Sequence, residues 1–479
     1  MNATNKYLMV EQYIRQKIDT GLLTDEDKLP SIRSLSDTLT VSKNTVIRAY
    51  QELEAQGMIY TVPKSGYRVS ARHSQAPSVH APNNVDLLSV CKEILTYSHQ
   101  QELLATGSAH PNIDTPAIKS LYAEIGRHSR RQSHTPSHYQ LPPGNELLLK
   151  HLTKISQDLG VNAGKNEIAI THGAQQAISL ALRALTKAGD IIAVESPCYF
   201  GNLLLMESLG LKVVEIPSCP RTGIDTQSLQ DALDNWDVKA LLVTPNFTNP
   251  TGARMPLDNR LKLLEVTGSI PIIEDDVFGA LAFDEGIPPL KTLDTQDRVI
   301  YVNSLSKMLD SRLRIGWILA GQYQAQIEKF LVCDNMGSLN LMQSAVADFL
   351  SSGKYRQHVQ RMKRLYQSNT KLFYQQLSYC LNQYPSLNGK FKLLLPQGSF
   401  LLWLALPSSF DSNALYQQTK SLGISILPGT IFDTSGQYSH CIRFSCSNFL
   451  SNPDWKLGVE KLATLIHHQL THLITRIES

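Results

Sequence analysis

The hydrophobic and polar positions of the first 70 residues predict helices followed by a β-hairpin. Apolar residues recur with helical spacing over residues 7–20. Pro30 and Ser31 are placed to start a second, short helix that ends at Leu39, and Ser42 can cap a third helix over residues 43–56. Two short runs typical of strands follow, at residues 58–62 and 66–70, with a turn at residues 63–65.

The remainder of the chain has a different pattern. A polar, proline-dotted stretch without periodicity, residues 71–84, is typical of a linker. Beyond Gly160, helical stretches alternate with short apolar runs at residues 168–171, 191–194, 213–216, 240–244, 272–275 and 299–303. This alternation favours an α/β fold with a mostly parallel sheet covered by helices. After about residue 350 a helix is followed by mixed strands, which predicts a smaller α+β lobe.

Composition adds little to this picture beyond the class of protein. Hydrophobic residues make up 42% and charged residues 18% of the chain, as in ordinary globular proteins. The net charge is only +3, so any binding of nucleic acid must depend on local charge. The 7 cysteines lack the paired spacing of a zinc site, and thiols in a reducing cytoplasm explain them most simply. No run approaches the roughly 20 apolar residues that span a bilayer, so we expect a cytoplasmic protein without a membrane partner.

The third predicted helix has one apolar and one polar face. The apolar face carries Val46, Ala49, Tyr50 and Leu53. A small helical domain with a solvated face is one explanation. The short second helix, the longer third helix and the hairpin favour instead a winged helix, which places the start of its recognition helix in the major groove. Lys43 and Asn44 carry suitable hydrogen-bond donors there, and Lys64 and Gly66 at the hairpin tip can approach phosphates or a minor groove.

Lys307 lies in a setting that an ordinary surface lysine does not share. It follows the apolar run 299–303, Ser304 and Ser306 precede it, and Arg314 comes one to two helical turns later. The hydroxyls and the guanidinium are suited to a phosphate. This combination predicts a pyridoxal phosphate (PLP) site in which Lys307 forms the imine with the cofactor.

Other segments carry candidates for the remaining contacts to PLP. Asp275 ends an apolar run, where it can keep the pyridine nitrogen protonated, although a helix-capping role is an alternative. Tyr199 can cover the ring or simply pack in the core, and Asn249 can bind the ring hydroxyl or belong to a plain turn. Backbone donors for the phosphate are expected at a strand-to-helix turn that contains Gly173, Ala174 and Gln175.

Residues 29–35, 41–54 and 65–67 resemble the GntR-type winged helix, and the resemblance covers roughly residues 6–70. It implies that DNA is contacted by Arg33, Ser42, Lys43, Asn44, Thr45, Lys64 and Gly66. Arg33 has an alternative role as the partner in a structural ion pair.

The segments around Lys307 resemble a fold-type I (class I) aminotransferase from about residue 100 to the C-terminus. The resemblance implies that Arg443 grips a substrate carboxylate, that Tyr139 reaches the phosphate in the partner subunit, and that Gly107 brings backbone close to the substrate. The chain departs from the family at Val277 and Phe278, because relatives usually carry a tyrosine there and neither residue donates a hydrogen bond. We therefore predict a protein that binds PLP but shows at most weak transamination.

A winged helix, a linker and an aminotransferase-like body in this order resemble the MocR subfamily of GntR-type regulators. We predict a DNA-binding head at residues 1–72, a linker at 73–98, and a body at 99–479 that binds PLP, senses an effector and dimerises. The resemblance implies a head-to-tail homodimer. We expect that an amine or amino acid, or PLP itself, controls binding to double-stranded operator DNA. An active aminotransferase with an accessory head, and a PLP-responsive regulator of vitamin metabolism, are the alternatives.

Overall fold

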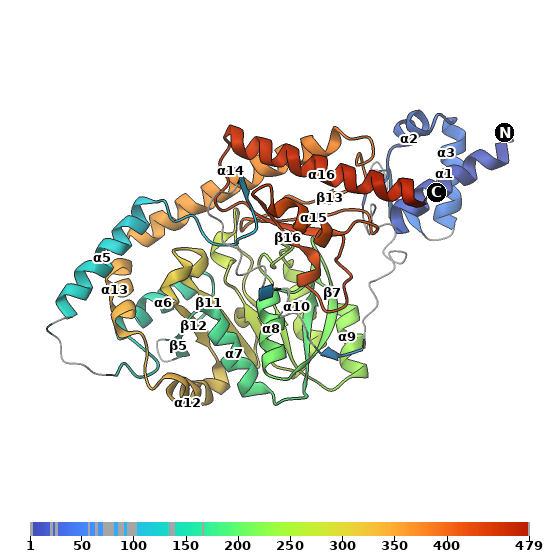
Figure 1. The fold of residues 1–479 in the computed structure, drawn as a ribbon. Coiled ribbons are helices and arrows are strands. Elements are labelled where there is room, and N and C mark those ends of the chain that lie inside the picture. The colour runs from blue at the N-terminus through green and yellow to red at the C-terminus, as the bar shows by residue number, and fades with distance from the viewer. Residues whose placement is uncertain are drawn as a thin grey trace.

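The chain folds into a small N-terminal head and a large two-part body (Figure 1). The computed structural model describes residues 3–19, 23, 27–55, 58–62, 66–69, 81–84, 91–92, 103–132, 134, 139–164 and 167–477. Within these ranges no helix is both long and apolar enough to cross a membrane.

The head has the predicted order of helices and hairpin. Its elements are α1 (Ala3–Asp19), α2 (Ile32–Leu39), α3 (Lys43–Ala55), β1 (Ile59–Val62) and β2 (Gly66–Val69). Ser31 caps α2 by accepting a hydrogen bond from the Ser34 N–H at 3.1 Å. The apolar face of α3 packs against the other helices and the hairpin, and the Tyr50 hydroxyl donates to the Pro30 carbonyl at 2.8 Å. The winged-helix architecture is therefore confirmed.

A nine-stranded sheet forms the centre of the body. Its strands are β3 (Asn83–Asn84), β5 (Ile168–Thr171), β6 (Ile191–Ser196), β7 (Lys212–Cys219), β8 (Gly223–Ile224), β9 (Val238–Val243), β10 (Ile272–Asp275), β11 (Val299–Ser304) and β12 (Gly316–Leu319). They follow the order β3-β7-β6-β9-β10-β11-β12-β5, with β8 paired to β7. Strands β7, β6, β9, β10 and β11 are parallel, as predicted, whereas β12 runs antiparallel to both β11 and β5.

Helices cover both faces of this sheet because its central strands are apolar on both sides. In β6, Ile192 and Val194 pack with α7 (Ala174–Leu185) on one face, while Ala193 packs with Leu229 and Leu263 on the other. The surrounding helices are α5 (Pro116–Gln132), α6 (Glu146–Asp158), α8 (Phe200–Ser208), α9 (Thr226–Asn235), α10 (Leu257–Thr267), α11 (Leu290–Leu293), α12 (Gln324–Asn335) and α13 (Asn340–Ser351).

The predicted α+β lobe follows residue 350 and lies against the large domain (orange and red in Figure 1). Its sheet has the order β13-β14-β17-β16. The lobe consists of α14 (Lys354–Asn382), β13 (Lys392–Leu393), β14 (Leu401–Ala405), α15 (Ser412–Lys420), β15 (Ile424–Ser425), β16 (Leu427–Pro428), β17 (Cys441–Ser445) and α16 (Pro453–Ile477). Strand β15 pairs with β4 (Leu104–Ala105), which ties the lobe to the start of the body.

Within the predicted linker, Asn83–Asn84 form β3 and pair with β7, and residues 81–82 and 91–92 are also described. The rest of residues 73–98 lies outside the described part of the chain. The domain boundaries at residues 72 and 98 stay a prediction.

Candidate functional site

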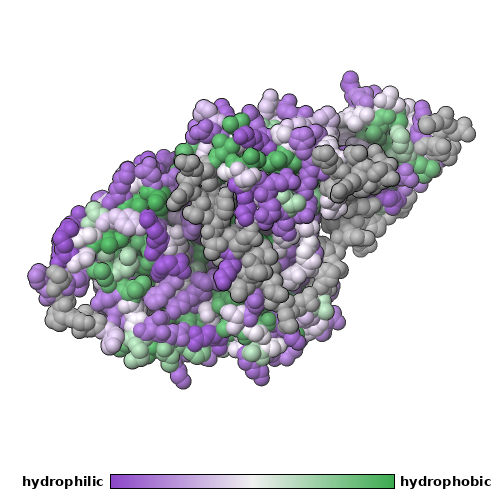
Figure 2. Space-filling view, in the orientation of Figure 1, coloured by the Kyte–Doolittle hydropathy of each residue, from purple (hydrophilic) through white to green (hydrophobic). Residues whose placement is uncertain are grey.

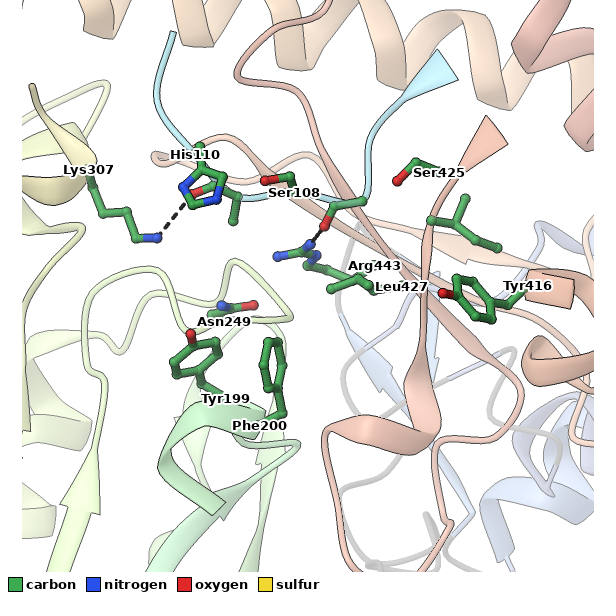
Figure 3. Close-up of a pocket in the computed structure, with 13 residues that line it drawn as sticks. Ser108, His110, Tyr199, Phe200, Asn249, Lys307, Tyr416, Ser425, Leu427 and Arg443 are labelled. Carbon is green, nitrogen blue, oxygen red and sulfur yellow. Dashed lines mark hydrogen bonds between the residues drawn. The ribbon is translucent and has the colours of Figure 1, made fainter. Parts of the chain in front are cut away.

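A cavity between the large sheet and the small lobe surrounds Lys307. Its part nearest the sheet has a volume of about 470 Å³. The predicted residues that line this part are Ala174, Gln175, Tyr199, Asn249, Asp275, Ser304, Ser306, Lys307 and Arg314. A second part of about 270 Å³ extends toward the small lobe, and Gly107 and Arg443 line it together with Tyr199, Asn249 and Lys307. Figure 3 shows Lys307 and Arg443 pointing toward one another from different elements.

Lys307 ends a short 3₁₀ turn, η3 (Leu305–Lys307), directly after β11. Its Nζ donates to the Ala109 carbonyl oxygen at 3.0 Å. Burial and the nearby charge of Arg443 lower the pKa of Lys307 to about 8, while Asp275 opposes this shift. About a tenth of this amine is therefore neutral at pH 7 and able to act as a nucleophile, far more than for an exposed lysine.

Asp275 stands at the carboxyl end of β10, where the edge of a parallel sheet commonly binds ligands. Its Oδ1 accepts a hydrogen bond from the Val277 N–H at 3.2 Å. Burial, together with the neighbouring charge of Asp276, raises the pKa of Asp275 to about 6, and the charge of Lys307 opposes only part of this cost of burying a carboxylate. A cationic group of a ligand beside this carboxylate would offset that cost.

The turn before α7 has room for a phosphate but not for a larger residue. Gly173 has φ 81°, and a Cβ at this position would lie 2.6 Å from the Arg314 Nη2. No side chain caps the start of α7, so its N–H groups are available to an anion. Arg314 Nη2 donates to the His172 carbonyl at 3.0 Å, and Ser304 Oγ lies 2.8 Å from Ser306 Oγ.

Gln175, although it lines the cavity, uses its side chain within the protein. Its Nε2 donates to the Gly201 carbonyl at 2.6 Å. By contrast, Asn249 Oδ1 is buried and makes no hydrogen bond with the described residues. A buried acceptor without a partner costs free energy, so a donor from a ligand would be stabilising at this atom.

Arg443, on β17, is fully buried. One of its terminal nitrogens donates to the Gly107 carbonyl, whereas its Nε is buried and has no partner in the described structure. Burial lowers the pKa of Arg443 to about 10. A Cβ at Gly107 would lie 2.1 Å from the Ser425 Oγ, so a larger residue here would displace this hydroxyl. The guanidinium thus retains hydrogen-bonding capacity for an anion.

Tyr139 does not belong to the cavity of its own chain, because 75% of its surface is exposed in the loop before α6. Val277 and Phe278 do line the cavity. The Phe278 ring centroid lies 5.6 Å from Lys307 Nζ and offers no hydroxyl. Sequence reasoning missed His110, which lines both parts of the cavity and whose Nδ1 lies 2.8 Å from Ser311 Oγ.

The predicted DNA contacts lie on the exterior of the head. Arg33, Ser42, Lys43, Asn44 and Gly66 are exposed, and Thr45 is half-buried. Ser42 Oγ accepts from the Thr45 N–H at 3.2 Å and so caps α3. Arg33 forms no ion pair with any described residue, so its alternative structural role gains no support here. Lys64 lies outside the described residues.

Comparisons with known proteins agree with this two-part architecture. Residues 108–460 match the class I and II aminotransferases, and residues 6–69 match the bacterial regulatory proteins of the gntR family. The HTH-type transcriptional regulator YjiR of Escherichia coli (strain K12) is 32% identical over 455 residues, covering 93% of this chain and 96% of that protein. NorG of Staphylococcus aureus (strain USA300), also an HTH-type transcriptional regulator, is 28% identical over 463 residues, with coverage of 92% and 99%.

Solved structures show the fold of the body. LysN, the α-aminoadipate aminotransferase of Thermus thermophilus, superposes with a TM-score of 0.70 at 23% identity, covering 80% of this chain and 95% of that one. That enzyme was solved with N-(5'-phosphopyridoxyl)-L-leucine. The chain belongs to the MocR subfamily of GntR-type transcriptional regulators, in which a winged-helix head is joined to a body with the aminotransferase fold.

Proposed function

We propose that this regulator binds double-stranded operator DNA through its head, and that PLP and an amine or amino acid at Lys307 control this binding. The observation that carries the proposal is one cavity lined by Lys307, by Asp275 at the end of β10, and by Arg443, whose Nε has no partner among the described residues. This cavity belongs to the same chain as a winged helix. A regulator of this kind acts in the cytoplasm.

The residues present fit PLP, which when bound supplies an aldehyde that reacts with amines and a ring that withdraws electrons. The phosphate would be held by the N–H groups at the start of α7, by Ser304 and Ser306, and by Arg314. Because Gly173 has no Cβ, the Arg314 guanidinium can lie beside this turn. Asp275 would gain a cationic partner in the pyridine nitrogen, and Tyr199 would cover the ring. The Asn249 Oδ1, which has no partner among the described residues, would accept a hydrogen bond from the ring hydroxyl.

The environment of Arg443 indicates which chemical group the effector carries. Its buried guanidinium has an Nε–H without a partner among the described residues. A carboxylate accepts paired hydrogen bonds from a guanidinium, and such pairs are strong where water is excluded. We therefore expect an effector with an amine directed at Lys307 and a carboxylate directed at Arg443, that is, an amino acid.

Phe278 is the reason why we propose a sensor rather than an efficient enzyme. Transamination requires protons to move between substrate and protein, and the position expected to hold a tyrosine hydroxyl holds a phenyl ring 5.6 Å from Lys307 Nζ. Lys307 can still carry a proton, so weak turnover would survive. Steady transamination of common amino acids by the purified protein would favour the plain aminotransferase instead.

A homodimer would give Tyr139 a role. The loop that carries Tyr139 is joined to the loop before α13 by a hydrogen bond from the Ser338 N–H to the Gln140 carbonyl at 2.8 Å. Leu141, Met336 and Leu339 near this junction are exposed, and Figure 2 shows hydrophobic residues over the end of the molecule where α5 and α13 lie. We propose that these surfaces meet in a head-to-tail dimer, where Tyr139 reaches the phosphate of the other subunit's cofactor.

The test uses DNA selected by the full-length protein from a random pool, so that the operator need not be known. Affinity for the selected DNA is then measured for the apoprotein, the PLP-loaded protein, and the PLP-loaded protein with a panel of amino acids. We expect the three forms to differ. A difference between apo and PLP-loaded protein alone would favour PLP as the signal, and equal affinities in all forms would refute ligand control.

A further inference from the structure

A second cavity, of about 460 Å³, lies between the head and the body. Asp27 lines it from the head, and Arg221, Lys392 and Trp403 line it from the body. The Arg221 Nη1 and Asp27 Oδ1 atoms form an ion pair at 2.9 Å. The head lies beside the body in Figure 1. Boundaries between domains are common places for ligand sites, and this volume falls in the range of small-molecule pockets.

Two cations line the cavity from the body, Arg221 and Lys392. Of these two, Lys392 is the one without a hydrogen-bond or ion-pair partner in the described part of the chain. Arg221 is neutralised by Asp27, whereas the Lys392 ammonium makes no hydrogen bond or ion pair with any described residue. Burial lowers the pKa of Lys392, and the charge of Asp27 opposes that shift. A half-buried ammonium that has no direct hydrogen bond or ion pair with a described residue is stabilised by an anion that enters the cavity.

Aromatic side chains of the small lobe also line the cavity. They are Tyr374 on α14, Phe391 before β13, Trp403 on β14 and Tyr438 before β17. The Trp403 and Tyr438 rings meet edge to face with centroids 6.1 Å apart. Such walls favour a flat, apolar ligand body, because offset and edge-to-face ring contacts add to the burial of apolar area.

We infer that this cavity is a second ligand site, which binds a small aromatic carboxylate with its charge on Lys392 and its ring against Trp403 and Tyr438. The site is separate from the cavity of Lys307, so its occupation does not rest on the proposed function. It is placed to affect both halves of the protein. Asp27 of the head and Arg221 of the body both line the cavity, and their ion pair connects the two parts of the protein.

Another lining residue, Trp403, connects this cavity to the cavity of Lys307. Trp403 on β14 pairs directly with Arg443 on β17. Phe432 packs edge to face on Trp403 at 5.7 Å and on Phe200 at 6.0 Å, and Phe200 lines the cavity of Lys307. A ligand that shifts Trp403 therefore acts on packed aromatic side chains that reach the effector site.

Calorimetric titration of the full-length protein tests the site, with benzoate, phenylacetate and indole-3-acetate as probes and their amides as uncharged controls. We expect saturable binding of at least one carboxylate and none of its amide. Lys392→Gln should weaken this binding about ten-fold or more, because it removes a charged partner. Lys390→Gln is the matched control, since Lys390 is exposed two positions away and does not line the cavity.

Lys392→Arg keeps the charge and should retain binding, which separates loss of the anchor from loss of the fold. The inference is overturned if no carboxylate binds at millimolar concentration, or if Lys392→Gln binds as tightly as the parent protein. It is also overturned if the carboxylate is lost from Arg443→Gln but not from Lys392→Gln, because the probe would then occupy the cavity of Lys307. PLP uptake, measured by absorbance in the same variants, reports on the proposed function independently.

Discussion

The head and the body place their candidate binding residues in opposite environments. In the head, Arg33, Lys43 and Asn44 are exposed on helices whose own core is complete without them. In the body, Arg443 is buried and Lys307 is half-buried in the wall of the cavity, and burial lowers the pKa of Lys307 to about 8 and that of Arg443 to about 10. One region would meet its ligand at the surface, and the other would bind its ligand in a cavity.

This difference follows from the ligands. DNA is a large polyanion, and exposed cations attract it from a distance at little cost to the folded head. A small molecule offers few contacts, so each contact has to be strong, and hydrogen bonds and charges are strongest where water is excluded. The body can tolerate the desolvation of buried charged groups because a large hydrophobic core surrounds the cavity.

The largest effect that distinguishes the two regions is expected from Lys307→Ala. Only an amine at this position can bond PLP covalently, so borohydride treatment should leave no cofactor attached to the denatured variant. Reversible PLP binding should survive, since the phosphate contacts and Asp275 remain. Absorbance spectra and the mass of the denatured protein measure both properties.

The control is Lys329→Ala, which removes an exposed lysine from α12 and should behave like the parent protein. Covalent cofactor in Lys307→Ala at the parent level would show that another amine is the site.

A smaller effect, confined to DNA, is expected from Lys43→Gln in the first turn of α3. Loss of a base or phosphate contact should weaken binding to the selected DNA by about 1–3 kcal/mol, while PLP uptake stays unchanged. If Lys43 contacts a phosphate, the slope of log affinity against log salt should also fall by about one unit. Lys212→Gln removes the same charge from the body, and equal affinities of the two variants would contradict a DNA contact at Lys43.

The two regions also differ in how far sequence reasoning reaches. The start of α3 and the ends of β5, β10 and β11 were predictable, because helical and strand periodicity locate them and the carboxyl ends of parallel strands meet at one edge. Gly173, Asp275 and Lys307 come together for this reason. The family resemblance supplied Arg443 and Gly107, which no local pattern would have placed together.

Other features depend on tertiary contacts that leave no local signal. Strand β12 has only four residues and runs antiparallel to its neighbours, so alternation of helices and strands does not reveal its direction. His110 lies in a segment without regular periodicity and reaches the cavity through the course of the backbone after β4. The second cavity joins Asp27 to Arg221, which are far apart in sequence.

Measurements over a range of pH test whether burial determines the reactivity of the Lys307 amine. Below a pKa of about 8 the neutral fraction of the Lys307 amine falls about ten-fold per pH unit. The rate of covalent PLP capture by the apoprotein should therefore rise from pH 6 to about 8 and then level off, as followed by stopped-flow absorbance. Asp275→Asn removes a charge that raises the pKa of Lys307, so its midpoint should be lower. A rate that still climbs steeply between pH 9 and 10 would mean that the amine behaves as if it were exposed.

The smallest effect is expected at the junction between the two regions. The side chains of Asp27 and Arg221 are 19% and 54% exposed, and ion pairs this accessible contribute about 0.2–1 kcal/mol. A double-mutant cycle of Asp27→Asn and Arg221→Gln isolates this pair from the other contacts of Asp27. Hydrogen exchange of β2 is a suitable measurement, because the Val69 N–H donates to the Asp27 carbonyl at 3.1 Å. If the two substitutions are additive, the ion pair does not link head and body, and a ligand in the second cavity would have to reach the head by another contact.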